Sequence, residues 1–126
     1  MPERARVAAF IREVEGGDHV KAIEDYYHPD ASMRENCKPA RVGRDALVAY
    51  EASVLERRKL KAVDTHPAHA VLIDGDNVAI HWTFDFVAHD GSRLRLTEVA
   101  LQRWRGDRIA EERFFYDPTA ILPPAA

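Results

Sequence analysis

The chain has 126 residues, 46% hydrophobic and 31% charged, which is the ordinary mixture of a globular protein. This length fits one domain, residues 1–126, with a folded core over about residues 5–118 and a short Pro-rich C-terminal tail. The formal net charge is −3 and no basic stripe collects along the chain, so we expect no nucleic-acid partner.

The single cysteine, Cys37, excludes an internal disulfide. The N-terminal apolar run Val7–Ile11 is too short for the core of a signal peptide. No stretch approaches the ~20 apolar residues that a membrane helix needs. We therefore expect a cytoplasmic protein with no membrane partner.

Three helices are expected before residue 60. The first has the apolar spacing of a one-faced helix, at Val7, Phe10, Ile11 and Val14. Gly16-Gly17 ends it, and the second helix ends at His28-Pro29 because the residue before proline leaves the helical region. The third runs from about Arg44 to about Lys59.

The remaining elements are expected to be strands. A short strand, Ala31–Glu35, precedes the third helix, and Leu60–Ile73 is a long extended stretch. Turn residues separate three further strands, which cover Asn77–Ala88, Arg93–Trp104 and Arg108–Tyr116. Helices followed by an antiparallel meander, without alternating strand and helix, indicate the α+β class.

Five short strings, in this order, have counterparts in one superfamily. They are Gly16-Gly17-Asp18, Tyr27-His28-Pro29-Asp30-Ala31, Gly43-Arg44-Asp45-Ala46, Gln102–Ile109 and Phe115-Tyr116-Asp117-Pro118. Together they resemble the nuclear transport factor 2-like superfamily, in its SnoaL-like and ketosteroid isomerase-like branch. The resemblance implies a cone-shaped nuclear transport factor 2-like (cystatin-like) fold. In it, three N-terminal helices pack on a curved antiparallel sheet that encloses a pocket, commonly in a homodimer. It does not imply one activity, because isomerases, cyclases, hydrolases, dehydratases and non-catalytic binding proteins share this fold.

The resemblance also suggests where a ketosteroid isomerase-like base would lie. That carboxylate stands at the end of the first strand, where this chain has Glu35 with Asn36 beside it. The two oxyanion donors of such isomerases fall at Phe10 and Ala100, neither of which can donate a hydrogen bond. Most of the electrostatic stabilisation of an enolate would then be missing, so we do not expect ketosteroid isomerase activity.

Glu98 is the stronger signal, because strand alternation places it on a face with Leu96, Ala100 and Trp104. A carboxylate buried there costs several kcal/mol unless it is paired or protonated. A hairpin turn at Asp90-Gly91 would set His81 diagonally beside Glu98. SnoaL-like cyclases use acid–base residues on this sheet surface, so we predict a His81–Glu98 dyad.

Three alternatives to this dyad stay open. The pair could be structural, a register slip could turn both side chains outward, or Asp85 could be the partner of His81. The predicted catalytic residues are therefore His81, Glu98 and Glu35. The predicted substrate-binding residues are Asn36, Tyr26, Tyr27, Asp85, Trp104, Glu112 and Tyr116. Tyr26 and Tyr27 are at least as well explained by core packing. The six histidines are scattered and no metal-binding spacing occurs, so we expect no metal and no cofactor.

Two functions fit these residues. The first is a cofactor-free enzyme that isomerises, cyclises, dehydrates or hydrates a small hydrophobic molecule by acid–base chemistry. The second is a non-catalytic ligand-binding or homodimeric interaction module with the same pocket. In both cases we expect a homodimer, because the predicted outer sheet face is too apolar to leave in water. We predict that this face contains Ile80, Trp82, Phe84 and Phe86 with Val99 and Leu101.

Overall fold

The structure is a computed structural model and describes residues 1–124. The helices in this range are α1 (Arg4–Glu15), α2 (His19–Tyr26), α3 (Arg44–Ala52), α4 (Val54–Arg57) and the 3-10 helix η1 (Pro118–Ala120). The strands are β1 (Tyr27–Glu35), β2 (Arg41–Val42), β3 (Leu60–Thr65), β4 (Ala70–Asp74), β5 (Asn77–Ala88), β6 (Arg93–Arg105) and β7 (Arg108–Phe115).

The first two helices form where the apolar spacing and capping residues predict them. The buried residues of α1 are the four apolar residues of its predicted stripe, Val7, Phe10, Ile11 and Val14. Asp18 caps α2, because its side chain accepts a hydrogen bond from the Lys21 N–H at 3.2 Å. Pro29 lies just beyond the end of α2, and β1 begins at Tyr27. A tight turn therefore joins two helices that present their apolar faces to the sheet.

The predicted third helix is interrupted at Ser53, which separates α3 from α4. The Ser53 hydroxyl donates a 2.7 Å hydrogen bond to the Tyr50 carbonyl. Such a bond from a side chain to the preceding turn competes with the backbone bonds of the helix. Lys59, with a φ of 54°, then turns the chain from α4 into β3.

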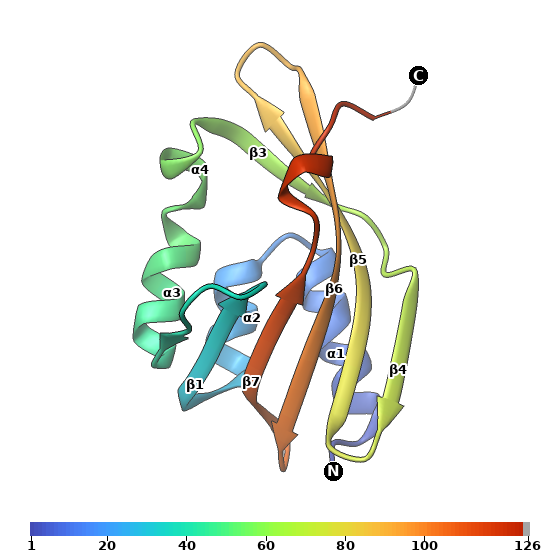
Figure 1. The fold of residues 1–126 in the computed structure, drawn as a ribbon. Helices are drawn as coiled ribbons and strands as arrows, with labels where there is room; N and C mark the ends of the chain where they lie inside the picture. The colour runs from blue at the N-terminus through green and yellow to red at the C-terminus, as the bar shows by residue number, and fades with distance from the viewer. Residues whose placement is uncertain (125–126) are drawn as a thin grey trace.

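The sheet is mixed, whereas the sequence predicted an antiparallel one. Its strand order is β2-β1-β7-β6-β5-β3, and β4 also pairs with β5. β1 and β7 pair in parallel, with Met33 beside Glu112, whereas the other pairs are antiparallel. Both strands run in the same direction in Figure 1. β7 is the last strand of the chain and pairs with β1 after the antiparallel strands between them have formed the rest of the sheet.

The sheet curves around the N-terminal helices, which lie on its concave side (Figure 1). Between them is the hydrophobic core, in which Trp104, Leu47 and Ile109 are at most 1% exposed. α3 and α4 stand beside the edge that β1 and β2 form. This α+β cone is the predicted fold class.

The register of the β5–β6 hairpin differs by one residue from the predicted one. The hydrogen bond from Ala88 N–H to the Ser92 carbonyl (2.9 Å) closes a three-residue loop, with Gly91 at a φ of 86°. A three-residue hairpin loop with a left-handed glycine is a common alternative to the two-residue turn assumed above. Trp82 therefore lies opposite Glu98, and His81 lies opposite Val99.

This register also corrects the predicted outer face of the sheet. Ile80 and Trp82 are buried in the core, and Phe84 and Phe86 face the concave side with them. Of the six side chains expected on the outer face, only Val99 and Leu101 lie there, 40% and 43% exposed. The aromatic residues of β5 thus wall the pocket.

Candidate functional site

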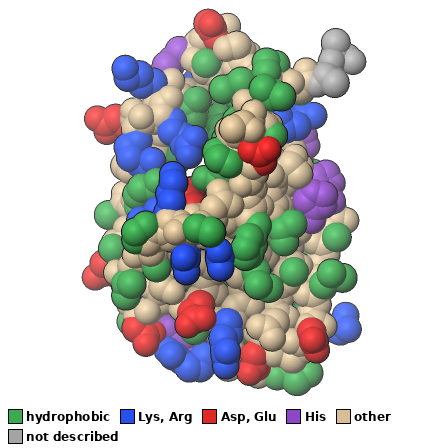
Figure 2. Space-filling view, in the orientation of Figure 1, with side chains coloured by type: hydrophobic (Ala, Val, Ile, Leu, Met, Phe, Trp, Pro, Cys, Tyr) green, Lys and Arg blue, Asp and Glu red, His purple; other side chains and the backbone are tan. Residues whose placement is uncertain are grey.

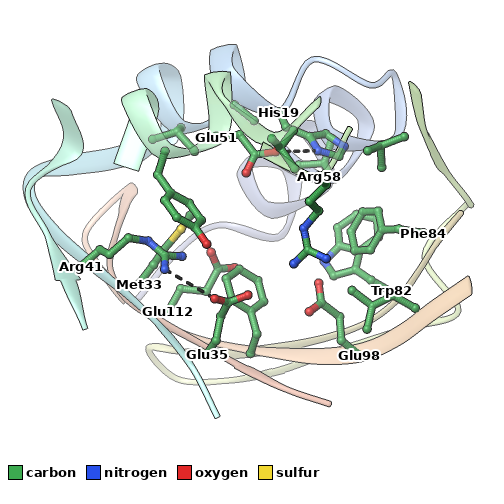
Figure 3. A pocket seen from close by; sticks show the side chains of 18 of the residues that line it. His19, Met33, Glu35, Arg41, Glu51, Arg58, Trp82, Phe84, Glu98 and Glu112 are labelled. Carbon is green, nitrogen blue, oxygen red and sulfur yellow. Dashed lines mark hydrogen bonds and ion pairs between the residues drawn. The ribbon is translucent and has the colours of Figure 1, made fainter. Parts of the chain in front are cut away.

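A pocket of about 150 Å³ opens between the concave sheet face and the helices. Its apolar wall includes Phe10, Met33, Trp82, Phe84, Phe86 and Leu96. Ionisable side chains reach into it from both layers, glutamates chiefly from the sheet and basic groups chiefly from the helical side (Figure 3). Figure 2 shows basic side chains gathered around a hollow beside α3 and α4. The pocket is therefore an apolar slot with charged groups at its floor and mouth.

Glu98 lies on the pocket floor with its carboxyl directed into the cavity (Figure 3). It is 8% exposed, and within residues 1–124 its carboxyl makes no hydrogen bond. Burial, followed by the negative charges of Glu112 and Glu35, raises its pKa to about 8. The side chain is therefore a neutral acid near neutral pH, with its proton available to a bound molecule.

Glu112 forms the second acidic group of the floor and is held by a chain of hydrogen bonds. The Tyr27 hydroxyl donates to one carboxylate oxygen, and the Gln102 amide donates to the other at 2.6 Å. The indole of Trp104 donates to the Gln102 carbonyl oxygen at 3.0 Å and so fixes the orientation of the amide. Burial raises the pKa of Glu112 to about 7, although both hydrogen bonds act in the opposite direction.

Glu35, at the end of β1, is the third carboxylate and is held by one residue outside the pocket and one that lines it. The Tyr116 hydroxyl donates to one oxygen at 3.1 Å, and an Arg41 nitrogen lies 3.5 Å from the other. Asn36 does not line the pocket: its side chain accepts a hydrogen bond from the Tyr116 N–H at 3.0 Å. Asn36 therefore positions Tyr116, which in turn positions Glu35.

The helical wall adds a hydrogen-bonded pair that sequence reasoning missed. His19 at the start of α2 contacts Glu51 of α3 at 3.3 Å through Nδ1 and the Thr65 hydroxyl at 2.8 Å through Nε2. Both His19 and Glu51 line the pocket. A proton on Nδ1 would be donated to Glu51, leaving Nε2 to accept from Thr65.

Three arginines line the mouth of the pocket, and two of them enclose one aromatic ring. The guanidinium groups of Arg41 and Arg57 lie 3.6 Å and 3.7 Å from the ring centroid of Tyr50. Arg58 lies 5.0 Å from the ring centroid of Phe86. Cations this close to an aromatic face are attracted by its quadrupole, so the rings hold the positive charge at the rim.

The predicted dyad of His81 and Glu98 is wrong in its geometry. Because the β5–β6 register is shifted by one residue, His81 projects from the opposite sheet face and does not line the pocket. Its ring lies 4.7 Å from that of His69. His81 therefore cannot exchange a proton with a ligand in this cavity.

Asp85 also lies on the outer face, and its partner is not His81. Arg95 donates two hydrogen bonds to its carboxylate, at 2.8 Å and 3.0 Å, and His66 lies 3.0 Å away. The Arg95 guanidinium, with a smaller contribution from His66, holds the pKa of Asp85 well below its usual range. Asp85 is thus a buried ion-pair residue outside the pocket.

Two further predicted ligand residues, Trp104 and Tyr26, belong to the core. Trp104 is 1% exposed and contacts the Phe10 ring edge-on at 6.2 Å. Tyr26 packs edge-on against Phe10 at 5.4 Å, with Arg6 over its other surface. Of the predicted substrate-binding residues, Tyr27 and Glu112 line the pocket directly, and Tyr116 reaches it through Glu35.

The described part of the chain contains no group of three or more His, Cys, Asp or Glu side chains that could hold a metal ion. Among the same residues, no helix is long and apolar enough to cross a membrane. The chemistry that these side chains supply is proton exchange by carboxyl groups and hydrogen bonding by guanidinium and phenol groups.

The curved sheet, the helices on its concave side and the acid-lined pocket define a cone-shaped α+β pocket protein. The chain belongs to the SnoaL-like domain family, whose pattern matches residues 7–112. No protein in the curated sequence comparison matches this chain.

Solved structures support the fold. A Mesorhizobium loti protein described as a candidate SnoaL-like polyketide cyclase is 24% identical, over 92% of this chain and all of that one, with a TM-score of 0.74. A Xanthomonas campestris protein with a cystatin-like fold is 22% identical, over 95% of both chains, with a TM-score of 0.76. TerC, co-crystallised with polyporic acid, is 15% identical over 92% of both chains, with a TM-score of 0.75. At these identities the likeness shows the fold alone.

Proposed function

We propose that this protein is a cofactor-free enzyme that moves protons on a small, largely hydrophobic carbonyl compound in its pocket. The observation that carries the proposal is the carboxyl of Glu98, which is buried, directed into the cavity and without a hydrogen-bond partner in the part of the chain that is described. The Glu98 oxygens remain accessible from the cavity, and a carboxyl group with a raised pKa in a pocket is a candidate functional group.

In the proposed reaction, Glu98 acts as general acid and Glu35 as general base. The carboxylate of Glu35 takes the proton from the carbon next to the carbonyl, and that C–H bond breaks. Its electrons form the C=C bond, and the Glu98 carboxyl transfers its proton to the carbonyl oxygen, which gives an enol. In each outcome the enol returns its O–H proton to Glu98 as the carbonyl reforms. The proton held by Glu35 goes to a different carbon and isomerises the substrate, or goes to the oxygen of a second carbonyl that the enol carbon attacks, which cyclises it. If that proton goes to a neighbouring hydroxyl, the hydroxyl leaves as water and the substrate is dehydrated.

The electrostatics support this division of roles. The pKa of Glu98, raised to about 8 by burial, keeps it protonated near neutrality, as a general acid requires. Glu35 accepts a hydrogen bond from the Tyr116 hydroxyl at 3.1 Å and lies 3.5 Å from an Arg41 nitrogen, and these contacts hold its carboxyl at the pocket. Glu112, held by the Tyr27 hydroxyl, adds a buried hydrogen-bonding group to the pocket floor. The family membership and the polyporic acid bound to TerC support a small-molecule ligand.

The test is deuterium exchange of benzylacetone, a neutral enolisable ketone with an aromatic ring, followed by NMR in deuterium oxide. We expect the protein to accelerate exchange next to the carbonyl, and Glu98→Gln and Glu35→Gln each to remove most of the acceleration. Glu111→Gln is the matched control, because Glu111 is exposed on β7. No acceleration with any enolisable ketone, together with tight ligand binding, would favour the alternative of a non-catalytic binding module.

We also propose a homodimer formed through the outer sheet face. Val99 and Phe115 are register partners, each 40% exposed, and Leu101 beside them is 43% exposed. Burying such neighbouring apolar side chains against a second copy would be favourable. Sedimentation should therefore give a dimer for the protein and a monomer for Leu101→Asp, whereas Arg103→Gln on the same face should leave the dimer intact. A monomeric parent protein at micromolar concentration would refute this proposal.

A further inference from the structure

Two of the three arginines at the pocket mouth, Arg57 and Arg58, carry a charge that no carboxylate of the described residues pairs with. Within residues 1–124, neither Arg57 nor Arg58 forms an ion pair. Arg57 donates its hydrogen bonds to neutral groups, the Ser53 hydroxyl at 2.8 Å and the Tyr50 carbonyl at 3.1 Å. Arg58 lies over the ring of Phe86, and its guanidinium points across the cavity toward Glu98 (Figure 3).

If every ionisable side chain that lines the pocket were charged, the pocket would have a net negative charge. Four glutamates and three arginines line the pocket, which gives an excess of negative charge on paper. Two of the glutamates, Glu98 and Glu112, have a raised pKa because they are buried, and Glu35 is paired with Arg41. Glu51 contacts His19 and keeps its negative charge, but the two unpaired guanidinium groups of Arg57 and Arg58 outweigh it. Near neutral pH the side of the pocket between Glu98 and Arg58 is therefore positive, and it offers hydrogen-bond donors from both residues.

We propose that the ligand of this pocket is a small organic anion whose charged oxygen binds between the Arg58 guanidinium and the Glu98 carboxyl. The inference rests on the proposed function, because it names the substrate class of the same site. An arginine and a neutral carboxyl group can each donate to one anionic oxygen, and such charge-assisted hydrogen bonds are stronger than neutral ones.

The walls define the rest of the ligand. Trp82 and Phe84 lie side by side with ring centroids 5.8 Å apart, next to Glu98 on the floor. A cavity of about 150 Å³ is the size that holds one benzene-sized ring, while the open mouth lets a longer molecule extend outward. The ligand class is thus an aryl or alkenyl group attached to a carboxylate, or to an oxygen that becomes anionic on enolisation.

A cationic ligand fits the same site poorly. It would have to displace the proton of Glu98 and would lie against the positive charge of Arg58. The carboxyl and guanidinium groups together therefore discriminate by charge, whereas the aromatic walls discriminate only by shape.

The experiment is isothermal titration calorimetry at neutral pH and low salt with three matched probes: hydrocinnamate, hydrocinnamamide and phenylpropylamine. They share the phenyl ring and chain length and differ only in the charge of the head group. We expect hydrocinnamate to bind about tenfold more tightly than the amide, and the amine most weakly. Arg58→Gln should bring hydrocinnamate to the affinity of the amide. Arg103→Gln, which removes the same charge from the outer face, should change neither probe.

Equal binding of all three probes, tighter binding of the amine, or an unchanged preference in Arg58→Gln would each overturn the inference. The proposed function is tested separately by the exchange of benzylacetone. If the protein exchanges this neutral ketone but shows no preference for hydrocinnamate, the proposed enzyme activity stands and the proposed anionic ligand is refuted. If hydrocinnamate is preferred and the preference depends on Arg58, but neither benzylacetone nor the keto acid phenylpyruvate is exchanged, the anion-binding site stands. The proposed enzyme activity is then refuted.

Discussion

Gln102 of β6 donates a 2.6 Å hydrogen bond to Glu112, its register partner on β7. Gln102 is 0% exposed, and its other amide atom accepts from the Trp104 indole. One side chain thus satisfies two buried groups, one on the pocket floor and one in the core. This joins the geometry of the site to the packing below it, because Gln102 connects Glu112 of the pocket to Trp104 of the core.

Replacing Gln102 by Leu should therefore destabilise the protein by about 2 to 4 kcal/mol, because the buried indole N–H of Trp104 loses its partner and the buried Glu112 loses one of its two donors. It should also raise the pKa of Glu112 further, since the Gln102 hydrogen bond lowers it. Urea unfolding measures the first effect. Arg103→Gln, at an exposed position on the same strand, is the control and should cost much less. Equal losses in the two variants would show that the network contributes little.

Glu98 should give the stability a pH dependence with a definite sign. The folded carboxyl keeps its proton up to a pKa of about 8, whereas the unfolded one loses it near 4.5. Between these values the folded state binds more protons, so stability falls as the pH rises and levels off above the upper value. Glu98→Gln removes this fall, so its advantage over the parent protein should grow across that window to about 2 to 4 kcal/mol.

The measurement is a series of urea unfolding curves from mildly acidic to mildly alkaline pH. Glu111→Gln removes an exposed carboxyl from the neighbouring strand and should follow the parent protein at every pH. A constant difference between Glu98→Gln and the parent protein would mean that the folded carboxyl titrates as it does in water. The general-acid role would then lose its basis.

The fold could be predicted from the sequence because its signals are local. The apolar spacing of Val7 to Val14 and the glycines after it define α1, and Asp18 and Pro29 mark the limits of α2. The parallel pairing of β1 with β7 could not be predicted, because it joins residues about eighty positions apart. The interruption at Ser53 depends on a single side-chain hydrogen bond.

The candidate site could be predicted only in part, because it depends on register. Alternation on β6 places Glu98 inward whatever its partner is, and so it survives a wrong hairpin loop. The residue that lies beside Glu98 on β5 depends on the length of the hairpin loop. A loop one residue longer places Trp82 rather than His81 on the inward face beside Glu98. Glu51 comes from α3 and Arg58 directly follows α4, and no sequence pattern encodes the distance of these helices from the sheet. In the sequence, His19 and Glu51 look like ordinary charged or polar residues on the surfaces of two helices, so their contact could not be predicted.

Asp85 should act as a stabilising ion pair on the outer face. It is 3% exposed and accepts two hydrogen bonds from Arg95, so Asp85→Asn should cost about 2 kcal/mol at neutral pH. Because Arg95 depresses the pKa of Asp85, this contribution is present above the unfolded value, about 3.9, and is lost as the pH falls below it. The difference between the parent protein and Asp85→Asn, measured by urea unfolding, should therefore shrink on acidification. Asp74→Asn, at an exposed position on β4, should show neither effect.

The positions of His81 and Glu98 on opposite sheet faces lead to a direct comparison of two variants. His81 contacts His69 on the outer face, so His81→Ala should leave deuterium exchange of benzylacetone unchanged. Glu98→Gln should slow that exchange roughly a hundredfold, because it removes the proton that a general acid supplies. Both variants should keep the far-ultraviolet circular dichroism of the parent protein, so that a loss of rate is not a loss of fold. A slow His81→Ala with an unaffected Glu98→Gln would mean that proton transfer occurs on the outer face and that the cavity has another role.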